Sequence, residues 1–357
     1  MSHTKSPTAV ICLSPNNGGM EINSIKMAQK LSPYCHLVLI AQKDSFISKK
    51  MEEDHKEIAL ETIKFRSTLG PALIFNIRKF VRKHGIKNVI FFGASELKSM
   101  YFSFLGLDIN LMVVHGTTKS HPKKDWFHRL IYSNVRYHVA ICDHLAKNVR
   151  YIFPFGKKCE LKRIYSSFEF KDISSSQGIH TPLRLIHVGR IVRGKGQIDG
   201  IKACQVLYDN DIEFEFSLVG EVADDHKQEL IATLDNLAYK ENIVFTGHVS
   251  DVGKRLENSD LFLFPSAGEG LSNAFLEAMS YGLVCIAYNN TSFPELKELG
   301  LHFHMAADQD LEDLKSVLLK TVKNITTEKA LSFENIKKVK TLFSQEREIL
   351  EYLELLI

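Results

Sequence analysis

The sequence predicts an α/β protein built from two doubly wound parallel-sheet domains. Short apolar runs alternate with longer segments of helical period along the whole chain, which is the pattern of parallel sheets covered by helices. The alternation stops over residues 166–182, which are rich in Ser, and then starts again. A chain of 357 residues is also too long for one core, because domains of about 100–200 residues are the norm.

Five apolar runs in the first half are expected to be strands, each followed by a helix. Each run is short and ends at a polar turn, as buried parallel strands do. The runs are residues 9–14, 36–41, 88–92, 111–115 and 137–141. Together they define an N-terminal domain over residues 1–170.

Five further runs repeat the pattern in the second half. These are residues 183–189, 214–220, 242–247, 260–266 and 283–288. They place a second domain over residues 178–343, and the last forty residues have helical period without a strand pattern. Because open α/β sheets bind ligands at the carboxyl ends of their strands, we expect the two domains to face each other across a ligand-binding cleft.

The charge is distributed unequally between the two halves. Residues 1–170 contain 26 Lys and Arg against 13 Asp and Glu, a balance of +13, whereas the remainder has 19 against 29, a balance of −10. A basic half in a nearly neutral chain indicates an anionic partner such as a phospholipid surface, a phosphorylated glycolipid or nucleic acid. A solvated lysine-rich face is the alternative.

Cysteine usage and hydropathy favour a cytoplasmic protein. The six cysteines form no Cys-x-x-Cys pair and no metal-ligand spacing, so we expect reduced thiols. The apolar run at residues 9–13 is too short for a signal peptide, and no run approaches the roughly 18 residues of a membrane span. Any membrane contact is therefore expected to be peripheral.

Residues 264–288 are the most informative segment, because they predict an amphipathic helix entered from a glycine-containing turn. The apolar residues at helical spacing are Leu271, Ala274, Phe275, Ala278 and Met279. The amides at the expected helix start belong to Gly270, Leu271, Ser272 and Asn273. Unpaired N–H groups at the positive end of a helix dipole form an anion site that suits a diphosphate.

Two carboxylates flank this helix start. Glu269 precedes the helix and Glu277 lies two turns into it, about 12 Å farther along the axis. A carboxylate can accept hydrogen bonds from both hydroxyls of a vicinal diol, so Glu277 suits a ribose and Glu269 suits a hexose ring. The alternative is that Glu277 is an ordinary exposed helix residue.

The stretch from Glu269 to Glu277 resembles the EX7E signature of the retaining glycosyltransferases of family 4. The helix start, both acids and the next strand match together, and the resemblance covers most of the chain. It implies a GT-B fold, in which two Rossmann-like domains face each other across a cleft, with a final helix over residues 344–357 that crosses back to the N-terminal domain. In this family the first Glu contacts the donor sugar and the second contacts the ribose. Glu295 matches an acid of structural use, and we assign it no catalytic role.

Residues 187–196 resemble the family's G-R-x-x-x-x-K-G element. Arg190 and Lys195 place two cations in a strand-to-helix turn, where they can neutralise a leaving diphosphate. The alternative, two surface cations at a helix start, is disfavoured because they would oppose the helix dipole. The resemblance also brings the amides of Ser272 and Asn273 to the donor.

Two features of the first half match the family as well. Gly18 and Gly19 follow the first predicted strand, where glycine lets the backbone approach a ligand, and they resemble the family's Gly-Gly loop over the donor phosphates. A plain strand-to-helix turn is the alternative. His115 ends a strand and matches a His that assists catalysis near the sugar, and a structural histidine is the alternative.

A basic segment that contains aromatic residues follows His115. Its basic residues are Lys119, His121, Lys123, Lys124, His128 and Arg129. Trp126 and Phe127 interleave with them, and this combination suits a lipid headgroup interface. The alternative is a solvated helix with two core aromatics. We do not expect nucleic acid as a partner, because the chain has no nucleic-acid-binding motif.

We expect no metal and no other cofactor. Asp308 and Asp310 match the DxD metal motif of the other glycosyltransferase fold, but they begin a helix, where acids favour the dipole. Asp224–His226 is likewise interpreted as a helix start rather than a ligand set. The glycines of residues 194–200 have the spacing GxGxxxG, which differs from the GxGxxG dinucleotide fingerprint.

The resemblance implies transfer of a hexose or N-acetylhexosamine from a nucleotide diphosphate sugar to a hydroxyl of a glycan or glycolipid, with retention at the anomeric carbon. A UDP-sugar is favoured over a GDP-sugar. The expected catalytic residues are Glu269, His115, Arg190 and Lys195, and the basic first half favours cell-envelope polysaccharide or lipopolysaccharide synthesis on the cytoplasmic face of the inner membrane. One alternative is an epimerase or phosphorylase of the same fold. The other is an inactive nucleotide-binding scaffold, which is disfavoured because the charged residues Glu269, Glu277, Arg190 and Lys195 are all present.

Overall fold

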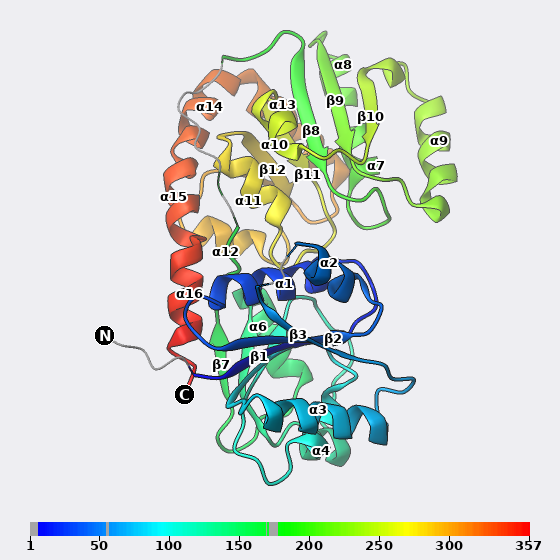
Figure 1. Cartoon of the computed structure of the whole chain (residues 1–357). Helices are drawn as coiled ribbons and strands as arrows, with labels where there is room; N and C mark the ends of the chain where they lie inside the picture. The colour runs from blue at the N-terminus through cyan, green and yellow to red at the C-terminus, as the bar shows by residue number, and fades with distance from the viewer. Residues whose placement is uncertain (1–5, 55–56, 169, 171–177) are drawn as a thin grey trace. The chain divides into compact units, whose positions relative to one another are not determined.

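The computed structural model describes residues 6–54, 57–168, 170 and 178–357, and the chain divides into two compact units (Figure 1). Unit 1 contains Met1–Ser166 and Gln345–Ile357, and unit 2 contains Ser167–Ser344. Part of the expected linker, residues 169 and 171–177, lies outside the described residues. Each unit has a parallel sheet accompanied by helices, which confirms the predicted fold class.

Unit 1 is built on a seven-stranded parallel sheet in the order β3-β2-β1-β4-β5-β6-β7. Its strands are β1 (Thr8–Cys12), β2 (Leu37–Gln42), β3 (Ala59–Ile63), β4 (Asn88–Phe92), β5 (Asn110–His115), β6 (Val135–Ala140) and β7 (Glu160–Arg163). Its helices are α1 (Gly19–Leu31), α2 (Phe46–Asp54), α3 (Pro71–Lys83), α4 (Leu97–Ser103), α5 (Trp126–Ile131), α6 (Asp143–Ile152) and α16 (Gln345–Leu353). All the strands predicted for the first half are present.

Unit 2 is built on a six-stranded parallel sheet in the order β10-β9-β8-β11-β12-β13. Its strands are β8 (Leu183–Val188), β9 (Phe214–Val219), β10 (Ile243–Gly247), β11 (Leu261–Phe264), β12 (Val284–Tyr288) and β13 (His304–Ala306). Its helices are α7 (Gln197–Ala203), α8 (Gln205–Tyr208), α9 (Lys227–Asp235), α10 (Val252–Glu257), α11 (Asn273–Ser280), α12 (Phe293–Glu298), α13 (Leu311–Lys323), α14 (Ile325–Phe333) and α15 (Asn335–Leu342), with short 3-10 turns at Asp224–His226 and Lys240–Asn242. The strands predicted for the second half are present too.

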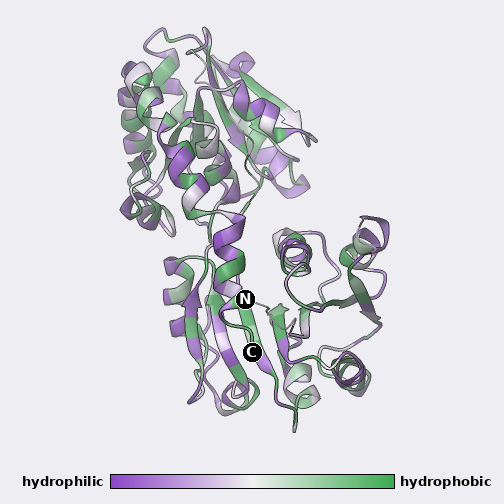
Figure 2. Cartoon of the chain, turned by 60° about the vertical axis from the view of Figure 1, so that its left-hand side comes forward, coloured by the Kyte–Doolittle hydropathy of each residue, from purple (hydrophilic) through white to green (hydrophobic). Residues whose placement is uncertain are grey.

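Several strands are buried along their whole length, which explains their unbroken apolar sequences. Every residue of β1 is buried, and β1 pairs in parallel with both β2 and β4. Every residue of β11 and β12 is buried as well. Figure 2 shows hydrophobic (green) stretches along strands of both units. A strand covered by helices on both faces has no solvated face, so it shows no alternation of polar and apolar residues.

Three strands were not predicted, and each lies at an edge of its sheet. They are β3, β7 and β13. β7 has the sequence ELKR and no buried residue, whereas β13 is only three residues long. An edge strand pairs on one side only and tolerates charged residues, so its sequence lacks the apolar run that marks a central strand.

The C-terminal segment is tied to unit 1 by polar contacts. Lys30 Nζ of α1 lies 2.6 Å from Glu348 Oε2 of α16, and both side chains are largely buried. Beyond α16, Asn110 Nδ2 donates to the Leu355 carbonyl at 2.7 Å, and the Ile357 amide donates to Asn88 Oδ1 at 3.0 Å. The last residues are therefore fixed at the amino ends of β4 and β5.

In unit 2, the chain that follows β8 contacts the chain that follows β11. Gly196 has a φ of 79°, and a Cβ atom at this position would lie 1.8 Å from the Pro265 carbonyl oxygen. The Gly194 carbonyl accepts hydrogen bonds from the Ala267 amide at 2.9 Å and from Ser266 Oγ at 3.1 Å. Because only glycine fits at position 196, the two loops are held in direct backbone contact.

We predict that Gly196→Ala destabilises the protein far more than Gly194→Ala. Gly194 also has a positive φ, of 84°, but no neighbouring atom lies within 4 Å of its would-be Cβ. Gly194→Ala should therefore lower the free energy of unfolding by about 1 kcal/mol, the cost of left-handed backbone for a side chain. Gly196→Ala adds the collision with Pro265 and should cost roughly 3 kcal/mol or more. Urea denaturation of both variants measures the difference, and equal losses would show that the loop contact is not tight.

Candidate functional site

Of the residues predicted to bind a diphosphate, those of unit 2 lie in the loops where β8 and β11 end and at the start of α11. These two strands are neighbours in the sheet although α7, β9 and β10 separate them in sequence. Residues 189–196 follow β8, and residues 265–272 follow β11. The order of the strands reverses at this point, and such a switch point is where open α/β sheets bind ligands.

Lys195 and Glu269 form an ion pair in these loops. Lys195 Nζ lies 2.6 Å from Glu269 Oε1, and Ser266 Oγ donates to the same oxygen at 2.9 Å. The Glu269 side chain is 12% exposed and that of Lys195 is 33% exposed. An ammonium has three N–H donors, of which this pair uses one. Lys195 is thus held in place and still has donors for an anion.

A strained residue holds the backbone of Glu269. Thr291 has a φ of 46°, a conformation that β-branched residues rarely adopt. Its Oγ1 accepts a hydrogen bond from the Glu269 amide at 3.2 Å and donates to Asn290 Oδ1 at 3.1 Å. Asn290 Nδ2 donates in turn to the Ser266 carbonyl at 3.0 Å. Such strain persists only where the surroundings impose it, and it clusters at functional sites.

His187, which the sequence analysis did not single out, supports the loop that carries Lys195. Its ring is buried and stacks on Phe264, with the centroids 4.9 Å apart. Burial lowers the pKa of His187 to about 4, so the ring is neutral near pH 7. The neutral ring donates from Nε2 to the Lys195 carbonyl at 3.0 Å. A histidine at the end of a buried strand is the signal that could have identified it.

The helix after Glu269 begins two residues later than its apolar period indicates. α11 starts at Asn273, because Ser272 is the N-cap and its Oγ accepts from the Phe275 amide at 3.3 Å. Gly270 and Leu271 therefore belong to the preceding turn rather than to the helix. The Ser272 cap leaves the amides of Asn273 and Ala274 in the first turn to face a ligand.

Arg190 and Glu277 are the two remaining predicted residues of unit 2. Arg190 is exposed in the loop after β8, and its carbonyl accepts a hydrogen bond from Gln197 Nε2 at 3.0 Å. Glu277 is half-buried on α11. The structure therefore places Arg190, Lys195 and Glu269 in the two loops at the carboxyl ends of β8 and β11, and Glu277 on the helix that follows them.

In unit 1, Gly18 and Gly19 lie at the start of α1. Gly18 is the N-cap in extended conformation, and Gly19 is the first residue of the helix. A Cβ atom on Gly19 would meet no atom within 4 Å. The packing of unit 1 would therefore allow a side chain at position 19. With glycine there, the space beside the start of α1 stays open.

His115 lies at the carboxyl end of β5 and belongs to a buried aromatic cluster. Its Nε2 lies 2.9 Å from His138 Nδ1 of β6, and its ring is 4.8 Å from that of Phe153. Burial lowers the pKa of both histidines, that of His138 to about 4. The two rings are therefore neutral near pH 7, and one donates a hydrogen bond to the other.

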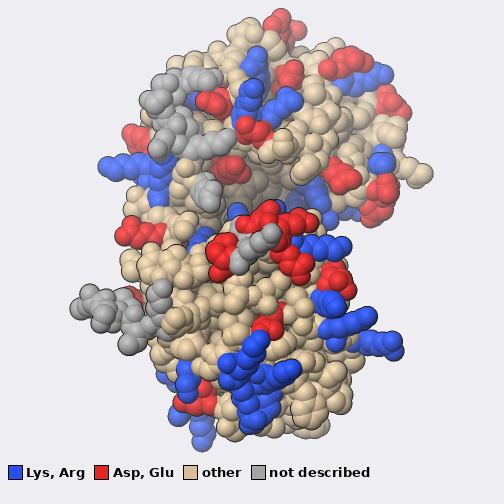
Figure 3. All heavy atoms as spheres, viewed as in Figure 1, with Lys and Arg blue, Asp and Glu red and all other residues tan. Residues whose placement is uncertain are grey.

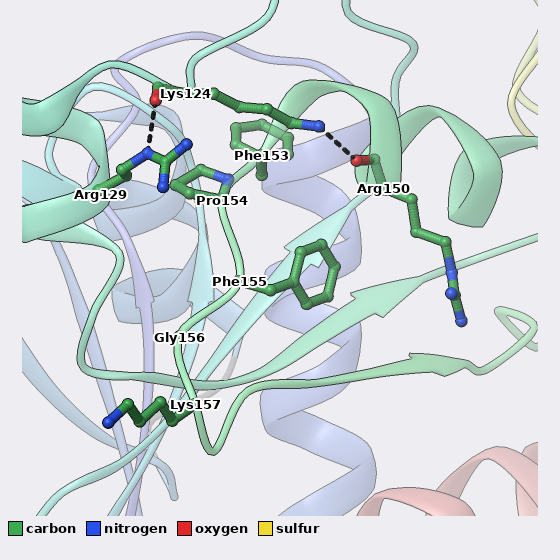
Figure 4. A pocket seen from close by; sticks show the side chains of 8 residues that line it. All are labelled: Lys124, Arg129, Arg150, Phe153, Pro154, Phe155, Gly156 and Lys157. Carbon is green, nitrogen blue, oxygen red and sulfur yellow. Dashed lines mark hydrogen bonds between the residues drawn. The ribbon is translucent and has the colours of Figure 1, made fainter.

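Part of the predicted basic segment lines a pocket of about 430 Å³ in unit 1 (Figure 4). Its lining residues are Lys124, Arg129, Arg150, Phe153, Pro154, Phe155, Gly156 and Lys157. Trp126 of α5 and Tyr151 of α6 are 75% and 60% exposed, so Trp126 is not a core aromatic. We call these ten residues the basic-aromatic surface.

Positive charge is not confined to this surface. On the face of unit 1 seen in Figure 3, Lys and Arg side chains (blue) gather over α3, whereas acidic side chains (red) gather over α2. Among the described residues, no helix is both long enough and apolar enough to cross a membrane.

The acidic residues of 308–310 and 224–226, which were predicted to begin helices rather than to bind a metal, lie at helix starts in the structure. Asp310 is the N-cap of α13, and its carboxylate accepts from the amides of Glu312 and Asp313. Asp224–His226 forms the 3-10 turn that leads into α9. Both positions use carboxylates at the positive end of a helix dipole.

The comparison with protein families matches residues 182–324 to the family described as Glycosyl transferases group 1. This range contains the whole sheet of unit 2 and the loops that carry Arg190, Lys195, Glu269 and Glu277.

Curated relatives share part of the chain. The amylovoran biosynthesis glycosyltransferase AmsK of Erwinia amylovora is 26% identical over 210 residues, which are 56% of this chain and 51% of AmsK. The capsular polysaccharide biosynthesis glycosyltransferase CapH of Staphylococcus aureus is 28% identical over 178 residues, which are 49% of this chain and 48% of CapH. The chain thus spans about half the length of the curated relatives it matches.

Solved structures show the same architecture. Anabaena HepE in complex with UDP matches with a TM-score of 0.82 and 16% identity, covering 97% of this chain and 98% of HepE. A glycosyltransferase from Rickettsia africae matches with a TM-score of 0.81 and 14% identity, covering 98% and 97%. At these identities the likeness is one of fold, and it confirms the predicted GT-B fold. Over residues 182–324, the chain is similar to the glycosyl transferases group 1 family.

Proposed function

We propose that this protein is a glycosyltransferase that takes its sugar from a nucleotide diphosphate sugar. The observation that carries the proposal is the Lys195–Glu269 pair, which lies in the loops at the switch point of the unit 2 sheet, just before α11. This arrangement offers a diphosphate a cation and helix-start amides, and it offers a sugar a carboxylate.

The departing diphosphate is the main electrostatic demand of sugar transfer. Lys195 and Arg190 neutralise the charge that develops on the phosphate oxygens, and the amides of Asn273 and Ala274 donate hydrogen bonds to them. Glu269 keeps the Lys195 ammonium in position before the donor binds. We expect no metal ion at the diphosphate, because these groups already supply positive charge.

Glu269 and Glu277 are proposed to bind the two parts of the donor that flank the diphosphate. Glu277 accepts from the ribose hydroxyls, and Glu269 accepts from the hydroxyls of the hexose or N-acetylhexosamine. A UDP-sugar is our preferred donor over a GDP-sugar. Structures of the fold neighbour HepE contain UDP in one case and UDP-glucose in another, which supports this preference.

We propose that the reaction retains the anomeric configuration. The bond between the anomeric carbon and the diphosphate oxygen breaks, and the acceptor oxygen bonds to the same face of that carbon. The acceptor proton passes to the departing phosphate oxygen, so atoms and charge balance without a protein carboxylate as nucleophile. His115 is neutral near pH 7, so its proposed role is a hydrogen bond to the sugar or the acceptor rather than proton donation from an imidazolium. The role proposed for Gly18 and Gly19 is binding of the donor phosphates.

The proposed acceptor is a hydroxyl of a glycan or glycolipid in cell-envelope polysaccharide or lipopolysaccharide synthesis. AmsK and CapH are named for polysaccharide biosynthesis, which supports this setting. The basic-aromatic surface of unit 1 combines four cations with an exposed Trp and Tyr, a composition that suits an anionic membrane surface. We therefore propose a cytoplasmic protein with peripheral membrane contact.

UDP binding tests the nucleotide part of the proposal. We expect UDP to raise the melting temperature, and both Arg190→Ala and Glu277→Gln to weaken its Kd by about 10-fold to 100-fold, the value of one charge-assisted hydrogen bond. Calorimetric titration gives the Kd values.

The matched controls for this titration are Arg193→Ala and Glu298→Gln. Arg193 lies in the same loop and pairs with Glu229 on the surface, and Glu298 is exposed on α12. Both controls should bind UDP as the parent does. The proposed donor site would be contradicted if variants and controls lost the same UDP affinity, or if neither UDP nor GDP bound. Either result would favour a protein without glycosyltransferase activity.

Glu269→Gln separates sugar recognition from nucleotide binding. UDP has no hexose, and the amide oxygen of Gln can still accept a hydrogen bond from Lys195. The Kd for UDP should therefore change by less than about threefold, whereas slow hydrolysis of the UDP-sugar in the absence of acceptor should fall by about 100-fold. Release of UDP from a panel of UDP-sugars measures the hydrolysis. Loss of UDP binding together with hydrolysis would assign Glu269 to the phosphates instead.

Membrane contact through the basic-aromatic surface is tested by sedimentation with vesicles. We expect binding to vesicles that contain phosphatidylglycerol, weaker binding at high salt, and little binding to phosphatidylcholine alone. Trp126→Ala should reduce binding by about 5-fold to 10-fold, whereas Phe75→Ala, an equally exposed aromatic residue on α3, should not. If Phe75→Ala reduced vesicle binding and Trp126→Ala did not, the membrane contact would instead be assigned to α3.

A further inference from the structure

Two histidines and one glutamate converge at the amino end of β13 in unit 2. His302 and His304 flank the buried Phe303, so their side chains lie on the same side of an extended segment. Glu328 Oε2 of α14 lies 2.7 Å from His302 Nε2 and 2.8 Å from His304 Nε2. All three ligand atoms lie within 4.8 Å of one another.

The backbone around these side chains is held firmly. The His302 amide donates to Asn335 Oδ1 at 2.8 Å, and Asn335 Nδ2 donates to the His302 carbonyl at 2.6 Å. Asn335 is completely buried. Lys297 Nζ donates a hydrogen bond to the carbonyl of Phe303, between the two histidines. The backbone of His302 is therefore fixed by two hydrogen bonds to the buried Asn335 side chain.

This donor set has the chemistry of a transition-metal site. Two imidazole nitrogens and one carboxylate oxygen are the ligands with which Zn²⁺ forms open sites that keep a water in the fourth position. Mg²⁺ and Ca²⁺ prefer sets made of oxygen atoms only. Without a metal, both imidazoles place a proton on Nε2 to donate to the same carboxylate oxygen. A divalent ion would bind at both Nε2 atoms, and each neutral imidazole would then carry its proton on Nδ1.

The side chains also leave room for an exchangeable ligand. His302 and His304 are 29% and 27% exposed, and Glu328 is 16% exposed. The cluster joins a three-residue edge strand to α14, two elements distant in sequence from the loops of the proposed nucleotide site. It lies at the amino end of β13, whereas the nucleotide-site loops follow the carboxyl ends of β8 and β11.

We propose that His302, His304 and Glu328 bind one divalent transition-metal ion, preferably Zn²⁺, which fastens β13 to α14. The ion keeps a water in its fourth position and takes no part in sugar transfer. The site is independent of the proposed function, so UDP binding and metal binding succeed or fail separately.

The test uses the full chain after treatment with a chelator and dialysis. We expect calorimetric titration with ZnCl₂ to show one site, and Zn²⁺ to raise the melting temperature without changing the Kd for UDP. Co²⁺ in place of Zn²⁺ should give the strong visible absorption of four-coordinate Co²⁺ with nitrogen and oxygen ligands. A parent protein that binds no Zn²⁺, or that binds Co²⁺ with the weak absorption of a six-coordinate ion, would overturn the proposal.

Variants locate the ion. His304→Gln and Glu328→Gln should each weaken Zn²⁺ binding by at least about 10-fold and abolish the Co²⁺ spectrum. His248→Gln, which removes an exposed histidine of the same unit, is the control and should bind as the parent does. Because Gln can hydrogen-bond in place of either residue, the metal-free variants should unfold near the parent temperature. Unchanged Zn²⁺ affinity in both cluster variants, or equal loss in the control, would contradict the assignment.

Discussion

The contact between the loops after β8 and β11 is the constraint on which the candidate site depends. Lys195 and Glu269 are 74 residues apart in sequence, and they meet because Gly196 lets the first loop touch the Pro265 carbonyl. The His187 ring donates a hydrogen bond to the Lys195 carbonyl, and Thr291 accepts one from the Glu269 amide. The backbone thus places a cation, a carboxylate and the start of α11 together before any ligand is present. Preorganised groups need no rearrangement when charge develops on a leaving group.

The fold and the positions of the charged residues of the candidate site could be predicted, because both depend on patterns of neighbouring residues in the sequence. Central strands such as β1 and β11 are unbroken apolar runs, and Glu269 and Glu277 stand at a fixed spacing around a helix start. The edge strand β7 was missed because one-sided pairing lets it be polar. His187 and Thr291 were missed because they act through hydrogen bonds to backbone groups that only the folded sheet brings near. Ser272 shifted the start of α11, since its cap bond competes with the apolar period.

Unit 1 shows how burial and exposure change the meaning of a residue type. His115 keeps its predicted place at a strand end, but burial beside His138 makes it a neutral hydrogen-bonding group. Trp126, only eleven residues later, is a large apolar side chain left in solvent next to cations. The excess of +13 in residues 1–170 does not distinguish these cases, because composition carries no information about burial. The basic-aromatic surface combines two exposed aromatic residues, Trp126 and Tyr151, with four cations that line a pocket.

We propose above that the loops after β8 and β11 bind a nucleotide diphosphate. The most direct measurement is the electron density of UDP in crystals of the full chain grown with UDP. The account predicts that the diphosphate lies within hydrogen-bonding distance of Lys195, Arg190 and the first amides of α11, with the ribose at Glu277. A nucleotide whose phosphates lie away from Lys195 and the start of α11, or whose ribose does not contact Glu277, would contradict it.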